Sequence, residues 1–447
     1  MIFEELELQE GKKALYSCLS VNKIWCEIIV PILWNNPWKS FNQGALLNVI
    51  ISHLSEESRN YLKFQGVKFL TNSFRKPLFD YISLCKHLNL CEIKNIINAT
   101  RESAIPAIEN EVYNLFVNNK NTKFTHLYIP RYFNHKILQG VSEIEFLSCY
   151  TSINDNILVE LTEKCRSIKE LKLGIEKEWI NNYELIRLIE TQKRLLKIHL
   201  SPADGSFYPS YDLLFIKSLE NSFIKHANTI ESCELNRQPV TTFVSTLVNL
   251  KRLRLDNYSS DNKWNWLEKL SLPFLKILSV SSIQIKSLIS LIENTSGYLT
   301  EIKIDYILHN EIDNKRIVQA IYQNCPDLKY LKLAFRNRNI LELENLLINC
   351  QHLSLLYILV NDASNFDWDN LFKILAESSP TSLFKFRFGL HYTTAKLETL
   401  KLFFDNWKGR RPILLQFSHY YVVNGLHDDL LEKYEAKGIV KLCELKF

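Results

Sequence analysis

A short apolar pattern recurs along most of this chain of 447 residues, and it constrains the fold more than any other feature. In its fullest form, a cysteine is followed by apolar residues three, six and eight positions later, as in the stretch from Cys325 to Leu333. The last two apolar residues are two positions apart and therefore point to the same side of a β-strand. The same arrangement begins again at Cys85, Cys165 and Cys350. This recurrence predicts a repeat protein.

Without the cysteine, the triad of apolar residues can be followed over twelve units. The first and the last triad begin 295 residues apart over eleven steps, which is about 27 residues per step. This period lies in the range of roughly 20–29 residues that is typical of leucine-rich repeats. The triads are Leu88/Cys91/Ile93, Phe124/Leu127/Ile129, Val141/Ile144/Phe146, Ile168/Leu171/Leu173, Leu195/Ile198/Leu200, Ile230/Cys233/Leu235, Leu250/Leu253/Leu255, Leu275/Leu278/Val280, Leu299/Ile302/Ile304, Leu328/Leu331/Leu333, Leu353/Leu356/Ile358 and Leu383/Phe386/Phe388.

The segments between triads carry apolar residues at helical spacing. Ile317, Ile321 and Cys325 are four positions apart and would form one stripe of an α-helix. One strand and one helix per repeat bury their faces against each other and against the next repeat. The sequence therefore predicts an α/β leucine-rich-repeat solenoid over residues 85–447, with parallel strands on the concave face and helices on the convex face. After Phe388 the pattern fades.

Residues 1–40 lie outside the repeat. The apolar residues that begin at Leu15 have near-helical spacing, and Pro31 is expected to end that helix. The segment that follows Pro31 is expected to be a turn in which Trp34 and Trp38 cover the end of the solenoid. A helical cap is one interpretation of this module, because repeat arrays require caps.

The same module resembles a known family. IFEEL, from Ile2, and ALYSCLSVNKIWCEIIVPILWNNPW, from Ala14, are similar to the F-box of F-box/leucine-rich-repeat proteins, closest to those expanded in some fungi. The most specific part is Val21-Asn22-Lys23-x-Trp25. A full F-box opens with a Leu-Pro motif and most of a helix before this match, so the module is expected to be N-terminally incomplete. Further stretches that resemble the family are SLIENTSGYLTEIKI, NKRIVQAIYQNCPDLKYLKL and FFDNWKGRRP.

The resemblance implies a substrate-recognition subunit of a Skp–cullin–F-box ubiquitin ligase. Residues 1–40 would dock on a Skp-type adaptor and through it on a cullin, residues 41–84 would be a helical transition, and residues 85–447 would bind a protein target. Such a subunit catalyses no bond change and supplies proximity, so neither an enzyme nor a cofactor is expected. The alternative is a leucine-rich-repeat scaffold or inhibitor whose N-terminal helices are only a cap. The residues assigned to the adaptor side are Phe3, Leu6, Leu15, Leu19, Val21 and Trp25, with Trp25 as a buried anchor.

Side chains between the triad positions point away from the core and would line the concave face. Cationic residues outnumber anionic ones there, eight to five, from the Cys165 unit onward. One interpretation is a surface that binds an acidic or phosphorylated segment of the target. A solvated strand face whose charges give solubility is the other interpretation. The candidate target-binding residues are Arg252, Arg254, Lys303, Tyr330, Lys332, Tyr357, Lys385 and Arg387.

Composition narrows the remaining classes. The net charge of +5 is too small and too dispersed to indicate a nucleic-acid partner. No apolar window reaches the roughly 18 residues of a membrane span, and the acidic N-terminus is unlike a secretory signal. The ten cysteines include no C-x-x-C pair and several occupy an apolar slot of the repeat, which favours a reduced cytoplasmic or nuclear protein. No catalytic motif or metal-ligand spacing occurs in the sequence.

Overall fold

The computed structural model divides the chain into two compact units, residues 1–226 and 227–447, and each is described by itself. No helix in the described ranges is long and apolar enough to cross a membrane. The described residues are 12–40, 42–67, 77–100, 102, 104–119, 122–133, 141–176, 181–203, 212–257, 264–305, 310–360, 366–390, 397–417 and 428–442.

Short helices precede the first strand of the first unit. Their apolar faces pack together, and the ring of Trp34 lies 4.5 Å from that of Tyr81. The Nε1 atom of Trp38 donates to the carbonyl oxygen of His87, in the first strand, at 2.6 Å. The predicted covering role of Trp38 is thus confirmed. The helices are α2 (Lys12–Cys18), α3 (Lys23–Asn35), α4 (Pro37–Ser40), α5 (Gln43–Ser52), α6 (Glu56–Phe64) and α7 (Tyr81–Leu84).

Five strands of the first unit pair in parallel and in chain order. In each strand, the middle residue of the triad lies in register with the middle residue of the next strand, as Leu127 does with Leu147. The strands are β1 (His87–Asn89), β2 (His126–Tyr128), β3 (Phe146–Tyr150), β4 (Glu170–Ile175) and β5 (Lys197–Pro202). Their helices are α8 (Leu90–Asn98), α9 (Ile105–Val117), α10 (Asp155–Lys164), α11 (Glu184–Glu190), α12 (Leu213–Ser222) and the 3₁₀-helix η2 (Phe223–His226).

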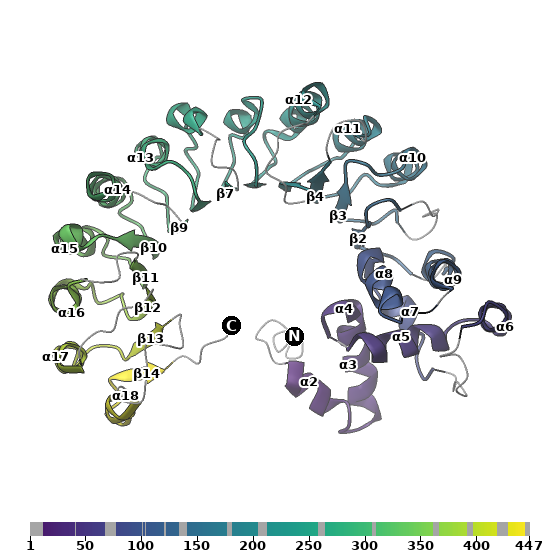
Figure 1. Ribbon diagram of the computed structural model, residues 1–447, viewed down its shortest axis with the longest axis horizontal. Helices are drawn as coiled ribbons and strands as arrows, with labels where there is room; N and C mark the ends of the chain where they lie inside the picture. The colour runs from purple at the N-terminus through teal and green to yellow at the C-terminus, as the bar shows by residue number, and fades with distance from the viewer. Residues whose placement is uncertain are drawn as a thin grey trace. The chain divides into compact units, whose positions relative to one another are not determined.

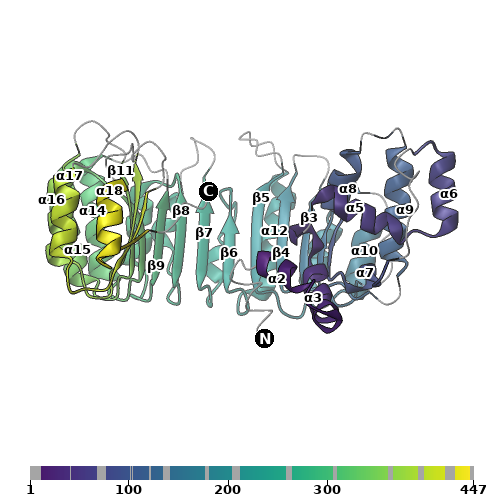
Figure 2. The same cartoon turned by 90° about the horizontal axis from the view of Figure 1, so that it is seen from below.

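The second unit continues the same plan with parallel strands paired in chain order. Its strands lie on one side and its helices on the other (Figure 1), and the strands run side by side (Figure 2). The strands are β6 (Ser232–Leu235), β7 (Arg252–Asp256), β8 (Ile277–Ser281), β9 (Glu301–Asp305), β10 (Tyr330–Phe335), β11 (Leu355–Val360), β12 (Lys385–Leu390), β13 (Ile413–Phe417) and β14 (Val440–Leu442).

The outer layer of the second unit is uneven. The repeats that follow β6 and β7 carry 3₁₀-helices, whereas an α-helix follows each strand from β8 to β13. These elements are η3 (Phe243–Thr246), η4 (Asn265–Lys269), α13 (Ile285–Glu293), α14 (Glu311–Asn324), η5 (Asn337–Asn339), α15 (Ile340–Asn349), α16 (Trp368–Ser378), α17 (Leu397–Asn406) and α18 (Asp428–Ala436).

Two predicted triads are wrong by one slot. Leu88 pairs with Leu127, so it holds the middle position of its triad, and Cys91 lies in α8 instead of a strand. The cause is local: the Asn89 side chain accepts the backbone N–H of Glu92 and starts the helix at once. The first triad is therefore Cys85/Leu88/Leu90, and the third is Ile144/Leu147/Cys149; all six side chains are buried.

Helix α3 runs through Pro31, so the prediction that Pro31 ends the helix and opens a turn is wrong. Proline removes one backbone donor, which would have bonded the carbonyl of Glu27. The Glu27 side chain is 53% exposed, so this residue lies on the solvent side of the helix. Burial of Leu33 and Trp34 after the proline holds the next turn in helical form.

The cysteine slot of the repeat has a defined use. The Cys165 thiol donates to the carbonyl oxygen of Val141 at 2.8 Å, and the Cys350 thiol lies 3.6 Å from the carbonyl oxygen of Cys325. In both cases the acceptor occupies the same slot of the preceding repeat. These cysteines are free thiols, as expected, and each links its repeat to the one before it.

Candidate binding surfaces

An exposed apolar stripe runs along the start of α3. Val21, Ile24, Trp25 and Ile28 are 56%, 66%, 37% and 46% exposed, although all are large apolar residues. Ile24, Trp25 and Ile28 are spaced to lie on one face of α3, and Val21 directly precedes its N-cap residue Asn22. The Asn22 side chain fixes the beginning of this helix by accepting the backbone N–H of Trp25 at 2.9 Å. The stripe is the feature of the N-terminal helices that sequence reasoning described least completely.

The predicted adaptor-side residues differ in how far they are exposed to solvent. Leu15 is fully buried and Leu19 is half-buried, whereas Val21 and Trp25 lie in the exposed stripe. The prediction that Trp25 is a buried anchor is wrong, because the buried side of α3 is formed by residues such as Ile29 and Leu33. Phe3 and Leu6 lie outside the described residues. Sequence reasoning missed Ile24 and Ile28, which a helical-wheel comparison of both faces could have found.

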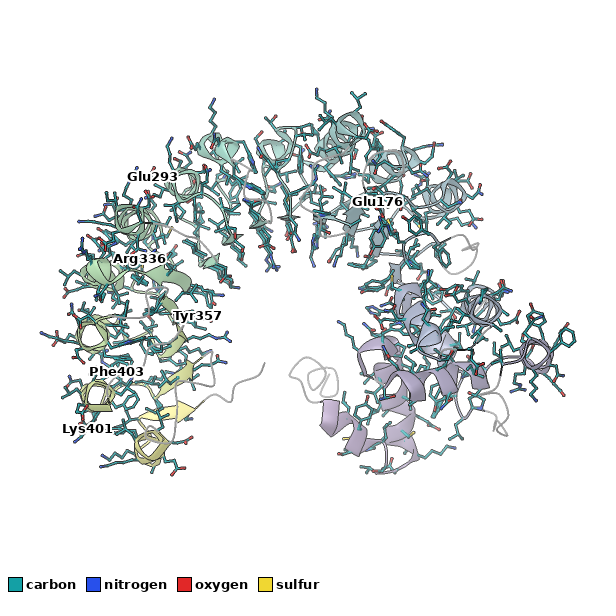
Figure 3. All side chains as sticks on the ribbon, in the orientation of Figure 1. Glu176, Glu293, Arg336, Tyr357, Lys401 and Phe403 are labelled. Atoms are coloured by element: carbon teal, nitrogen blue, oxygen red, sulfur yellow. The ribbon has the colours of Figure 1, made fainter. Side chains whose placement is uncertain are left out.

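On the strand face of the second unit, four predicted target-binding residues form one row. Lys303, Lys332, Tyr357 and Arg387 are successive register partners across β9, β10, β11 and β12. The predicted adjacency of Lys303 and Lys332 is therefore confirmed. Tyr357 projects on the strand side of the unit, opposite the helix that carries Lys401 (Figure 3). We call these four residues the cation–tyrosine row.

Aromatic rings separate the charges of the cation–tyrosine row. The Lys303 Nζ atom lies 4.8 Å from the centroid of the Tyr330 ring. The Lys332 Nζ atom and the Arg387 guanidinium lie 4.7 and 4.9 Å from the centroid of the Tyr357 ring. Contacts of this kind are worth about 0.5–1 kcal/mol at exposed sites and about 2 kcal/mol when desolvated. The Tyr357 ring is buried. Burial also raises the pKa of Tyr330 to about 12, so its hydroxyl stays protonated at neutral pH.

Several of the predicted cations are already neutralised within the unit. Lys303 pairs with Glu301 at 3.3 Å, and Lys332 pairs with Asp305. The Nε atom of Arg254 lies 3.0 Å from the Asp256 carboxylate, whose pKa is raised by burial.

The other predicted cations lack such partners. For Arg252, Lys385 and Arg387, no ion pair is formed with any residue in the described ranges. The strand-face charges are thus of two kinds, and sequence position alone does not separate them.

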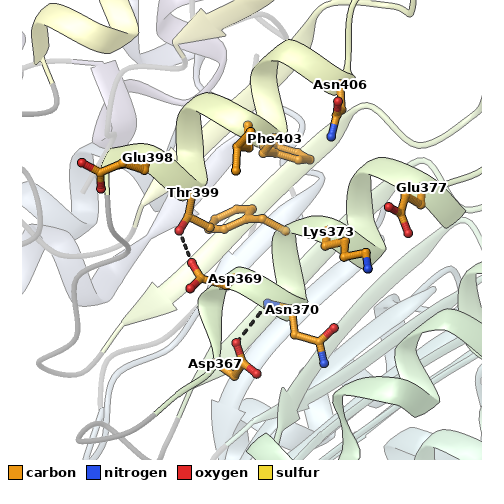
Figure 4. A pocket seen from close by; sticks show the side chains of 11 residues that line it. Asp367, Asp369, Asn370, Lys373, Glu377, Glu398, Thr399, Phe403 and Asn406 are labelled. Carbon is orange, nitrogen blue, oxygen red and sulfur yellow. Dashed lines mark hydrogen bonds between the residues drawn. The ribbon is translucent and has the colours of Figure 1, made fainter.

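A pocket lies on the helix side of the second unit, between α16 and α17 (Figure 4), with a volume of about 820 Å³. Phe372 and Phe403 pack with ring centroids 5.1 Å apart and are both buried. Two of its carboxylates serve the fold: Asp367 accepts the backbone N–H of Asn370, and Asp369 accepts from Thr399. We assign these acids to helix capping and to helix–helix contact. Within the described ranges, no three His, Cys, Asp or Glu side chains are grouped to hold a metal ion.

Each unit has the architecture of an α/β repeat solenoid of the leucine-rich-repeat type. In the first unit, N-terminal helices precede the first strand. No family model matches the sequence, and no curated protein matches it. Among solved structures, the chain is similar to the leucine-rich repeat-containing protein LegL7 from Legionella pneumophila, at 14% identity and a TM-score of 0.31. That match covers 67% of this chain and 82% of LegL7.

Proposed function

We propose that this protein is a substrate receptor of a Skp–cullin–F-box ubiquitin ligase. The proposal is supported by the resemblance of residues 1–40 to an F-box and by the exposed stripe of α3. The N-terminal helices would dock on the Skp-type adaptor, and the strand face of the solenoid would bind the protein target. The protein would act in the cytoplasm or the nucleus as a non-catalytic subunit without a cofactor.

The stripe is the observation that carries the proposal. A contiguous exposed patch of large apolar residues marks an interaction site more often than a monomer surface. Apolar anchors three and four positions apart, as Trp25 and Ile24 are from Ile28, are typical of a helix that inserts into an apolar groove of a partner. The opposite face of α3 is held by burial of Ile29, Val30, Leu33 and Trp34, so the stripe is presented on a fixed helix.

The solenoid would contribute proximity rather than chemistry. Holding a target beside a charged conjugating enzyme turns ubiquitin transfer into an effectively intramolecular step. The long row of parallel strands offers a broad surface for one bound segment, which suits this role.

The second candidate is a leucine-rich-repeat scaffold or inhibitor whose N-terminal helices only cap the array. The hydrogen bond from Trp38 to His87 and the packing of Trp38 against Phe116, at 6.2 Å between ring centroids, favour a capping role. A cap and a docking module can use the same helices, because capping contacts and the exposed stripe occupy different sides.

A pull-down with purified Skp-type adaptor separates the two candidates. Full-length protein should retain the adaptor, and the double variant Ile24→Asp/Ile28→Asp should lose it. A matched control is Leu341→Asp/Ile348→Asp on α15, where the two side chains are 64% and 54% exposed. The ligase proposal is rejected if the adaptor is not retained even after a Leu-Pro-containing helix is added upstream, or if both double variants bind alike.

A further inference from the structure

We propose that the end of the strand face formed by β12 and the residues leading into β13 binds an extended, Asp/Glu-rich segment of a partner protein. Lys385, Arg387 and Arg411 would hold its carboxylates. This inference rests on the proposed role of the strand face in target binding and places that binding at one end of it.

Cations on this strand face differ in whether they have an acidic partner. Lys303, Lys332 and Arg254 each have an acidic partner, so their charge is offset within the protein. Lys385 and Arg387 have no such partner among the described residues. Among the described residues, β12 therefore carries two cations without an ion pair, whereas on β7 Arg252 has none but Arg254 pairs with Asp256.

The local sequence strengthens this bias. The segment from Phe384 to His427 contains seven Lys or Arg residues and two Asp or Glu residues. Its net charge of +5 equals the formal net charge of the whole chain. One of its two acids, Asp405, is engaged by Lys408 at 3.0 Å and by the Tyr434 hydroxyl at 2.8 Å. This stretch of sequence is therefore basic, and its described cations lie on both sides of the unit, with Lys401 on helix α17.

Aromatic rings hold the cations of this site in place. The Arg411 guanidinium and the Lys385 Nζ atom lie 3.5 and 5.3 Å from the centroid of the same ring, that of Phe384. The Arg387 guanidinium rests on Tyr357, and its buried Nε atom has no hydrogen-bond partner in the part of the chain that is described. A stacked guanidinium keeps its planar edge available for a bidentate contact to a carboxylate.

A glycine makes room for this arrangement. A Cβ atom on Gly389 would lie 3.1 Å from the Tyr357 ring and 2.7 Å from the Leu359 side chain. The tyrosine ring therefore lies directly over the backbone of β12, where it supports Arg387. A side chain at this position would require the Leu359 side chain to shift and the Tyr357 ring to move by a few tenths of an ångström.

The spacing of the two β12 cations matches that of an extended peptide. Lys385 and Arg387 are two positions apart on one strand face, which separates their Cα atoms by roughly 6.6–6.8 Å. Alternate side chains of an extended peptide have the same separation. Two carboxylates at i and i+2 of such a peptide match two separate cations better than one compact dianion does. We therefore assign carboxylates, rather than a phosphate group, as the ligand.

The test is fluorescence anisotropy with labelled nine-residue peptides on the full-length protein. One peptide alternates Glu with Ser, a second replaces Glu by Gln, and a third carries a single phosphoserine with no Glu. The wild type should bind the Glu peptide, with affinity falling as salt rises. Lys385→Gln/Arg387→Gln should weaken binding by roughly tenfold or more. The matched control Arg254→Gln/Lys303→Gln should change it less than about threefold, because those cations are already paired.

Three outcomes would overturn the inference. The first is equal loss in both double variants, and the second is equal binding of the Glu and Gln peptides. The third is tighter binding of the phosphoserine peptide or of a single-stranded RNA of nine nucleotides than of the Glu peptide. Circular dichroism of both variants confirms the fold. Retention of the Skp-type adaptor is measured on the same samples, so that loss of peptide binding with intact adaptor binding rejects this inference alone.

Discussion

The Sγ atom of Cys165 donates to the carbonyl oxygen of Val141 at 2.8 Å and so joins two successive repeats through a buried thiol. Serine would place a more polar hydroxyl in this apolar slot, and alanine would leave the carbonyl without its donor. The cysteine therefore combines a small apolar volume with a weak donor. Cys350 makes the corresponding contact to Cys325, whereas the Cys85 thiol donates to the carbonyl oxygen of His87 in its own repeat.

The first prediction concerns the stability of this joint. Cys165→Ala should lower the free energy of unfolding by about 1–2 kcal/mol, because it removes a hydrogen bond and leaves a small void. Urea unfolding followed by circular dichroism measures the change. The control is Cys18→Ala, whose side chain is half-buried and whose loss should cost less. Equal effects of the two substitutions would contradict a structural role for the thiol.

The second prediction concerns thiol reactivity. Burial raises the pKa of Cys85, Cys165 and Cys350 to about 12, so these residues remain thiols at pH 8. Because the thiolate is the reactive form, a maleimide should modify them only after unfolding. Cys18 and Cys26 are partly exposed and should react in the native protein. Mass spectrometry of peptides after short labelling checks the order, and early modification of Cys350 would contradict it.

The third prediction concerns acid sensitivity. Burial, and then the neighbouring His126, lower the pKa of His87 to about 4, and their rings stack at 3.7 Å. The folded protein therefore holds His87 neutral, whereas an unfolded chain binds a proton near pH 6.5. The contribution of neutral His87 to the free energy of unfolding should be fully present above about pH 6.5. It should be lost progressively as the pH decreases from there toward 4.

Chemical denaturation at several pH values measures this dependence. His87→Gln should flatten the decline between pH 6.5 and 4. The control substitution His352→Gln, at an exposed position, should leave the pH dependence of stability unchanged. An NMR titration that gave His87 an ordinary pKa would argue against burial as the cause.

The fourth prediction compares two tryptophans of one helix. Trp25 is 37% exposed in the stripe, whereas Trp34 is 5% exposed beneath it. Trp34→Ala should cost roughly 3–5 kcal/mol of stability, the usual range for a buried aromatic residue. Trp25→Ala should cost clearly less and should instead weaken adaptor binding. Thermal unfolding and the adaptor pull-down are measured together, and a larger stability loss for Trp25 would reverse the assignment of the two faces.

Most of the fold could be predicted because one rule repeats many times. A buried triad such as Leu331 with its flanking apolar residues is set by the alternation of a strand, and alternation is visible in sequence. The errors occurred where a single residue departed from the rule. β13 was not predicted, since Pro412 occupies the position of its first apolar residue. Pro31 lies inside a helix that neighbouring burial stabilises, which no local propensity reveals.

The sequence was sufficient to predict which residues share the strand face, but not which of their charges are paired. The strand alternation correctly placed Lys303, Lys332 and Tyr357 on one face. Which lysine pairs with which acid depends on register and rotamer, as in the contact of Lys332 with Asp305 on the next strand. The exposure of Trp25 depended on which side of α3 meets the other helices, and this is a property of tertiary packing.

The uneven outer layer of the second unit has a geometric consequence for the cation–tyrosine row. An α-helix with its side chains is about 10–12 Å across, whereas paired strands lie about 4.8 Å apart. Successive repeats with α-helices are therefore spaced more widely on the helix side than on the strand side, which curves the sheet. The repeats with the narrower 3₁₀-helices η3 and η4 contribute less curvature. The row lies among α-helical repeats, from β9 to β12, so its side chains are expected to lie closer together than those on β6 and β7. Substitutions that change the size of side chains on an outer helix would therefore change the distance between Lys332 and Arg387 without altering any residue of the row.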